Sequence, residues 1–127
     1  MQNQKSALGL DGNIAALIGY IFGIVALILI FIEKDNKFVR FHALQSVLWS
    51  VVCVVGLFVV MIVGMIISAI LGAMSNTLGI LGFGITMLLY FAVIFGMLGG
   101  LIFGAIKAYG GTEYKLPIVG NMAQKWV

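Results

Sequence analysis

The distribution of apolar and polar positions along the chain predicts three long membrane-spanning helices. A short polar lead precedes an apolar run at residues 14–32, and Asn13 has the residue type favoured at a helix N-cap. At about 1.5 Å for each residue this run would extend roughly 28 Å, close to the ~30 Å hydrocarbon core of a bilayer. No small-residue cleavage site follows Ile32. We therefore predict a first span at residues 14–32 that is retained, not cleaved as a signal peptide.

A charged loop at residues 33–40 separates this run from a much longer apolar region. The one cluster of three consecutive polar residues in that region is Ser-Asn-Thr at 75–77, so we predict a second helix at 41–74 and a third at 78–106. Both exceed the ~20 residues that a span needs, so they must tilt, kink or project from the membrane. A four-span division is the alternative, although it requires a second turn where the sequence has no polar cluster.

The composition supports lipid as the surrounding solvent. The chain of 127 residues is 63% hydrophobic and 9% charged, whereas a soluble domain carries about 25% charged residues. No Asp, Glu, Lys or Arg occurs between Arg40 and Lys107. The length suffices for one domain, so we predict a single all-α integral membrane domain over residues 1–127. The single cysteine, Cys53, cannot form an internal disulfide.

The basic residues predict the orientation of the three spans. Lys5 alone lies on the N-terminal side, and the Ser-Asn-Thr turn adds no basic residue to that side. Six basic residues lie on the other side, in the first loop and the C-terminal tail: Lys34, Lys37, Arg40, Lys107, Lys115 and Lys125. The positive-inside rule then predicts a plasma-membrane protein with a cytosolic loop and tail and an external N-terminus. Four spans would give no such bias. Because these residues flank apolar segments, we expect no nucleic-acid partner.

The C-terminal tail, residues 107–127, has the pattern of a short amphipathic helix. Pro117 suits a first helical position. After it, one face is apolar, with Ile118, Val119, Met122, Ala123 and Trp126. Such a helix would lie in the inner headgroup region. We predict three aromatic anchors at the membrane interface, namely Tyr109, Tyr114 and Trp126.

Small residues recur at a spacing of four in each predicted helix, which places each set on one helix face. In lipid, such faces let helix backbones approach closely and gain dispersion contact. They indicate packing of the three helices within one chain, or homo-oligomerisation through the longest face, on the third helix. The three faces comprise Ala15, Gly19 and Gly23, then Gly64, Ser68 and Gly72, then Ala92, Gly96, Gly100, Gly104 and Ala108.

A polar stripe marks the start of the second helix. His42, Gln45, Ser46 and Trp49 follow helical spacing and come directly after Arg40. Polar side chains at membrane depth must face protein, water or headgroups. The stripe is therefore either an internal network that ties this helix to the tail or first loop, or a contact site for a partner.

Chemistry-bearing constellations are not evident elsewhere. His42 has no second ligand at metal-binding spacing, and the carboxylates at Asp11, Glu33, Asp35 and Glu113 pair with no nucleophile. We therefore predict no catalytic residues, no metal and no cofactor. The mid-membrane polar residues are few, namely Cys53, Ser68, Thr86 and Tyr90, which makes a poor ion pathway in one chain.

Two segments carry a resemblance to a known family. Residues 33–46 (EKDNKFVRFHALQS), together with 105–109 (AIKAY) and 114–120 (YKLPIVG), resemble the signature of a family of small multispan membrane proteins of archaea and bacteria without an assigned function. That family looks distantly similar to the multispan import subunit of the chloroplast inner envelope and to magnetosome proteins that influence crystal size. The import subunit has Phe-Asn-x-x-Gln-Ala where this chain has Phe-His-Ala-Leu-Gln-Ser at 41–46. The resemblance implies a shared structural or contact element at this motif.

The leading hypothesis from the sequence is a non-enzymatic component that organises or assists other membrane components, in assembly or translocation. Its expected partners are the lipid bilayer, other membrane proteins and further copies of the chain. The alternative is a homo-oligomeric channel or small-solute transporter packed through the glycine faces.

Overall fold

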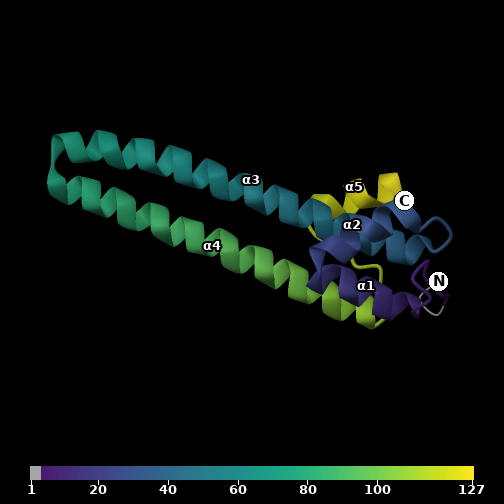
Figure 1. Ribbon diagram of the computed structural model, residues 1–127. Coiled ribbons are helices and arrows are strands. Elements are labelled where there is room, and N and C mark those ends of the chain that lie inside the picture. Colours follow the sequence, from purple (N-terminus) through teal and green to yellow (C-terminus); the bar gives the residue numbers. More distant parts are fainter. Residues whose placement is uncertain (1–3) are drawn as a thin grey trace. The chain divides into compact units, whose positions relative to one another are not determined.

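The computed structural model describes residues 4–127, and these residues are almost entirely helical (Figure 1). They contain no β-strand, and one isolated bridge joins Lys5 to Asp11. The five helices are α1 (Gly12–Ile21), α2 (Gly23–Ile32), α3 (Lys37–Met74), α4 (Asn76–Tyr109) and α5 (Val119–Trp126). They form two compact units: a terminal unit, made of the chain up to Ser50 together with Leu98–Val127, and a middle unit, Val51–Met97. The all-α prediction is confirmed for the described residues.

Helices α3 and α4 are the two that are long and apolar enough to cross a membrane. They have 38 and 34 residues, or about 57 and 51 Å at 1.5 Å for each residue. Ser75 alone separates them, and its hydroxyl accepts the backbone N–H of Leu78 at 3.4 Å, which caps the start of α4. Compared with the predicted ranges 41–74 and 78–106, α3 begins earlier and α4 is longer at both ends.

The range 14–32 is divided between two helices, so it does not form the one continuous helix that the sequence predicts. Helix α1 ends at Ile21, Phe22 is extended (φ −117°, ψ 100°), and α2 packs back against α1. Figure 1 shows the two helices side by side. Gly19 and Ala26 face each other across the two helices: a Cβ at Gly19 would lie 3.7 Å from the Cβ of Ala26, in van der Waals contact. Ten residues extend about 15 Å, half of the hydrocarbon core.

The N-terminal segment contacts the first loop, although the predicted three-span topology places the two on opposite sides of the membrane. The Ala7 N–H donates to Oε2 of Glu33 at 2.7 Å, and the Asn36 side chain donates to the Gln4 carbonyl at 2.9 Å. Asn13 likewise donates to the carbonyl of Tyr109, at the end of α4, at 3.2 Å. Groups that hydrogen-bond to each other cannot lie on opposite faces of a bilayer. The N-terminal segment, the loop and the end of α4 therefore lie together within the terminal unit.

Small residues bring α3 and α4 together within the middle unit. A Cβ at Gly64 would collide with Thr86, and one at Gly79 would lie 2.7 Å from the Cα of Gly72. The hydroxyl of Ser68 donates to the Gly64 carbonyl at 2.7 Å, and that of Thr86 donates to the Gly82 carbonyl at 2.9 Å. Both hydroxyls are therefore hydrogen-bonded within their own helices. The large apolar side chains of this unit point outward, including Phe58, Ile62, Ile80 and Leu88.

The terminal unit holds the interior of the protein. Its main cluster is built on alanines that allow α1, α2, α3 and α4 to approach closely, together with Tyr20, Leu29, Phe38 and Val39. A second cluster joins Phe41 and Leu44 of α3 to Ala123 of α5.

The tail differs from its prediction in two respects. Helix α5 begins at Val119, because Ile118 has φ 67° and ψ −61° and the Val119 N–H donates to the Pro117 carbonyl at 2.7 Å. This is a classic γ-turn, a rare and strained conformation. The predicted apolar face is also split: Val119 and Ala123 are fully buried, whereas Ile118 is exposed. Helix α5 thus packs against protein with half of its apolar face.

Replacing Ile118 by glycine should stabilise the protein. A β-branched residue at positive φ costs on the order of 1–3 kcal/mol, and glycine adopts this conformation freely. Because glycine also gains entropy in the unfolded chain, we expect a net increase of about 1 kcal/mol in the free energy of unfolding, measured by denaturant titration in detergent. Ile118→Val keeps the branched Cβ and is the control. Equal stability of the two variants would show that the turn stores no strain.

Candidate functional site

The predicted polar stripe lies in the interior of the terminal unit. His42 and Gln45 are fully buried, and Ser46 is almost so. They face Tyr20 of α1 and the backbone of residues 110–118, which we call the strap because this segment runs from α4 over these side chains to α5. We call Tyr20, His42, Gln45 and Ser46 the buried polar network.

The hydrogen bonds of His42 define its tautomer. Its Nε2 lies 3.1 Å from the carbonyl oxygen of Thr112, which can only accept, so Nε2 carries the proton. Its Nδ1 lies 3.0 Å from the Tyr20 hydroxyl and accepts the hydroxyl proton. Three aromatic rings pack edge-on around the imidazole, those of Phe38, Phe41 and Tyr20, with centroids at 4.6, 5.1 and 5.7 Å. The geometry is therefore that of a neutral histidine in an aromatic enclosure.

Gln45 joins the strap to α1. Its Nε2 donates to the Tyr20 hydroxyl at 2.8 Å and to the Tyr114 carbonyl at 2.9 Å, and its Oε1 accepts the Leu116 N–H at 2.8 Å. Gly120 allows this approach, because a Cβ there would lie 2.8 Å from Oε1 of Gln45. One side chain thus makes three bonds to two separate segments of the chain.

These contacts favour the first of the two interpretations of the stripe. Every polar atom of His42 and Gln45 is hydrogen-bonded inside the chain, and Ser46 donates to the Ala43 carbonyl at 3.0 Å. A partner could reach these three side chains only by displacing the strap. The network holds α1, α3 and the strap together and offers no free group to a substrate.

Two members of the predicted stripe lie outside this network. Arg40 donates from Nη1 to the backbone carbonyl of Glu33 at 3.1 Å, and its Nε is buried without a hydrogen-bond partner within the protein. Trp49 is half-buried and lies against Gly100, where a Cβ would collide with the indole ring.

Three residues of the site were not predicted from the sequence. Tyr20 was assigned to an apolar span, although a single tyrosine in such a run signals a polar partner nearby. Glu33 is buried, and its carboxylate accepts the N–H groups of Ala7 and Asn36 at 2.7 and 3.1 Å. Asn36 in turn accepts the Val39 N–H at 3.3 Å and caps α3. The charged loop is therefore an ordered capping element.

The predicted packing glycines fall into two groups. Gly104 faces Tyr20, where a Cβ would lie 2.5 Å from Cε1, and Gly100 faces Trp49. Gly19, Gly64 and Gly72 also meet neighbours within the chain, whereas a Cβ at Gly23 or Gly96 would meet nothing within 4 Å. Gly100 and Gly104 of α4 thus serve contacts inside the terminal unit, whereas Gly96 has no such contact.

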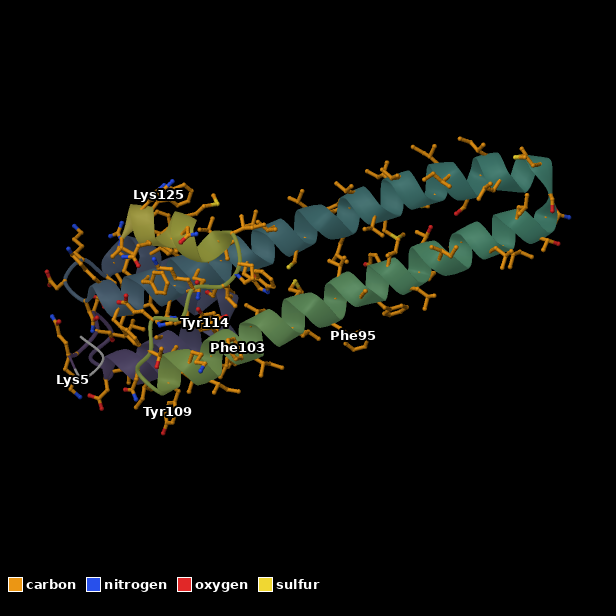
Figure 2. The ribbon with its side chains drawn as sticks, turned by 180° about the vertical axis from the view of Figure 1, so that it is seen from behind. Lys5, Phe95, Phe103, Tyr109, Tyr114 and Lys125 are labelled. Carbon is orange, nitrogen blue, oxygen red and sulfur yellow. The ribbon has the colours of Figure 1, made fainter. Side chains whose placement is uncertain are left out.

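The predicted aromatic anchors are exposed in the terminal unit, and Figure 2 labels two of them, Tyr109 and Tyr114. Tyr109, Tyr114 and Trp126 are 58%, 42% and 53% exposed. The ammonium of Lys107 lies 5.3 Å from the centroid of Phe103, whose ring packs edge-on against Tyr114 at 4.9 Å. Exposed aromatic rings beside a basic group are typical of a membrane interface.

Comparison with known proteins identifies relatives over nearly the whole chain. Residues 5–123 match the model of the magnetosome magnetite crystal formation protein family. Two proteins of Methanocaldococcus jannaschii are similar: UPF0132 membrane protein MJ1443 is 34% identical, with 96% of this chain and 94% of that protein covered, and UPF0132 membrane protein MJ1527 is 33% identical, with 94% and 73% covered. No solved structure matches the chain significantly.

These findings confirm the resemblance to small membrane proteins and to the magnetosome branch, and the similarity to the chloroplast import subunit stays a prediction. Because the family model covers both predicted signature segments, the match and the two helices able to span a membrane point to the same assignment. The chain belongs to the magnetosome magnetite crystal formation protein family, whose relatives include UPF0132 membrane proteins.

Proposed function

We propose that this protein is a non-enzymatic, membrane-anchored structural component that organises other membrane components through its terminal unit. The observation that carries the proposal is the separation of charge: all seven basic and all four acidic residues belong to the terminal unit, and the middle unit has none. A chargeless unit with outward apolar side chains suits anchorage in lipid. A charged unit with a tightly bonded interior suits contact with other molecules through its surface.

The chemistry of the terminal unit supports a structural role over an enzymatic one. Asp11 pairs with Lys5 at 2.6 Å, and the carboxylate of Glu33 is occupied by backbone N–H groups. Among the described residues there is no group of three or more side chains that could hold a metal ion. The exposed polar groups that remain include Lys34, Lys37, Asn121 and Gln124, together with the carboxylates of Asp35 and Glu113. Such groups bind partners and headgroups more readily than they perform chemistry.

The proposed topology has two crossings, by α3 and α4, with the terminal unit on the cytosolic face of the plasma membrane. What supports it is that the N-terminal segment bonds to the first loop, so all seven basic residues can lie on one side. This is a stronger positive-inside bias than the six against one of a three-span chain.

The channel alternative gains no support from the middle unit. The hydroxyls of Ser68 and Thr86 are bonded to carbonyls of their own helices. In a single copy these two hydroxyls are therefore not free to bind a permeating solute. Homo-oligomerisation remains a prediction from the glycine faces.

Photo-crosslinking in native membranes tests the proposed function. A photoreactive residue at Lys34 or Asn121, both exposed in the terminal unit, should give a discrete product with a membrane protein that co-purifies with the wild type. The matched control is Asn76, exposed at the turn of the middle unit, which should give no such product. The double variant Lys34→Glu/Lys37→Glu should lose the co-purifying protein. Identical patterns from all three positions, or no product from Lys34 and Asn121, would contradict the proposal.

A further inference from the structure

The outer surface of the α1–α2 hairpin is strongly apolar. Phe22, Ile24 and Phe31 are 59%, 73% and 77% exposed, and Ile21 is similarly open. No charged residue occurs between Gly12 and Ile32. An apolar surface of this extent is unstable in water and indicates contact with a membrane or another apolar surface.

The two ends of the hairpin lie together, and its tip lies away from them. At the base, the Ala7 N–H, in the segment before α1, donates to Glu33, the residue after α2. Near the tip, Gly19 of α1 faces Ala26 of α2. Each arm is about 15 Å long, half the thickness of the ~30 Å hydrocarbon core. A segment of this length with both ends on one side cannot cross the bilayer.

At the reversal, the backbone groups of Phe22 itself are hydrogen-bonded within the protein. Backbone groups exposed to acyl chains must be hydrogen-bonded within the protein. The Phe22 N–H donates to the Ile18 carbonyl at 2.8 Å, and the Phe22 carbonyl accepts the N–H groups of Val25 and Ala26 at 3.0 and 3.2 Å. The one non-helical residue of the hairpin therefore has both of its backbone groups bonded.

We propose that α1–α2 is a re-entrant hairpin whose exposed face inserts among the acyl chains of the basic-side leaflet and returns to the same side. The inference rests on the proposed topology. Lipid is favoured as the occupant over a protein because the chargeless surface ends at cationic Lys34 and Lys37, which complement anionic headgroups. The same unit also exposes Tyr109 and Trp126, the residue types of an interfacial belt.

Insertion into one leaflet has a mechanical consequence. The hairpin adds two helices to the area of the basic-side leaflet and none to the other. Expanding one leaflet favours a membrane that is convex on that side. The hairpin would thereby let the protein shape the membrane that it occupies.

Depth measurements on the full chain in proteoliposomes test the hairpin. In a Cys53→Ala background, a single cysteine replaces Phe22 at the tip, and an environment-sensitive fluorophore is attached. Phe95, exposed on α4 in the middle unit, provides the acyl-chain reference, and Lys34 provides the aqueous reference (Figure 2 labels Phe95). We expect lipids with nitroxide-bearing acyl chains to quench the label at Phe22, as they quench the label at Phe95. Aqueous iodide should quench the label at Phe22 as little as it quenches the label at Phe95.

A second pair of labels separates this inference from the topology on which it rests. Cysteines at Leu8 and Asp35, both exposed, should react with a membrane-impermeant reagent from the same side. If they do, but iodide quenches Phe22 as strongly as Lys34, the hairpin lies in water and the inference is overturned while the topology stands. If they react from opposite sides, α1–α2 crosses the membrane and both proposals fail.

Discussion

Replacing Gln45 by leucine should detach the strap and strongly destabilise the terminal unit. Leucine has nearly the same volume, but it leaves the Tyr114 carbonyl and the Leu116 N–H without their partner and removes a bond to Tyr20. Each buried polar group left without a partner costs about 1–3 kcal/mol, so we expect a loss of roughly 3–5 kcal/mol in the free energy of unfolding. Denaturant titration in detergent measures this loss, and proteolysis after residue 110 should become rapid.

Gln124→Leu is the matched control for this substitution. It makes the same chemical change at an exposed position of α5 and should alter stability by less than about 0.5 kcal/mol. If Gln45→Leu were as mild as Gln124→Leu, the strap would not depend on this side chain and the network would have no structural role.

Gly104→Ala should destabilise the protein, whereas Gly96→Ala should not. The added methyl at Gly104 would lie 2.5 Å from Cε1 of Tyr20, whose hydroxyl is held by His42 and Gln45, so the ring cannot withdraw without breaking those bonds. Overpacking of this kind costs about 1–3 kcal/mol. A methyl at Gly96 meets nothing within 4 Å, and alanine favours a helix over glycine by up to about 1 kcal/mol.

The two substitutions make the same change eight residues apart on α4, so the difference between them isolates the contact with Tyr20. We expect Gly104→Ala to unfold at lower denaturant than Gly96→Ala, with the gap reduced when Tyr20 is replaced by serine. Equal stability of the two alanine variants would show that α4 does not pack against Tyr20.

Hydropathy and charge were sufficient to predict the helical class and the two long spans. The absence of Asp, Glu, Lys and Arg from residue 41 to 106 reflects the cost of placing charge inside a bilayer. The polar cluster at 75–77 marks a turn at the membrane surface. The division at Phe22 could not be predicted in this way, because an apolar run of span length satisfies a crossing helix and a re-entrant hairpin equally well. The small residues Gly19 and Ala26 were the available signals of a close helix contact. They indicate such a contact only once it is known that a second helix lies opposite.

Only the α3 side of the buried polar network was predicted from the sequence. Helical spacing correctly placed His42, Gln45 and Ser46 on one face of α3. Spacing within one helix does not reveal what lies opposite, and their partners are Tyr20 on α1 and carbonyls of the strap. The γ-turn at Ile118 was also beyond prediction, because a β-branched residue rarely adopts positive φ.

The account depends most on both ends of the chain and the first loop sharing one face of the membrane. Single cysteines at Leu8, Asp35, Asn76 and Gln124, placed in a Cys53→Ala background, can be labelled in right-side-out and inverted vesicles with an impermeant maleimide. The account predicts that Leu8, Asp35 and Gln124 are labelled in inverted vesicles and Asn76 in right-side-out vesicles. Labelling of Leu8 together with Asn76 would contradict it.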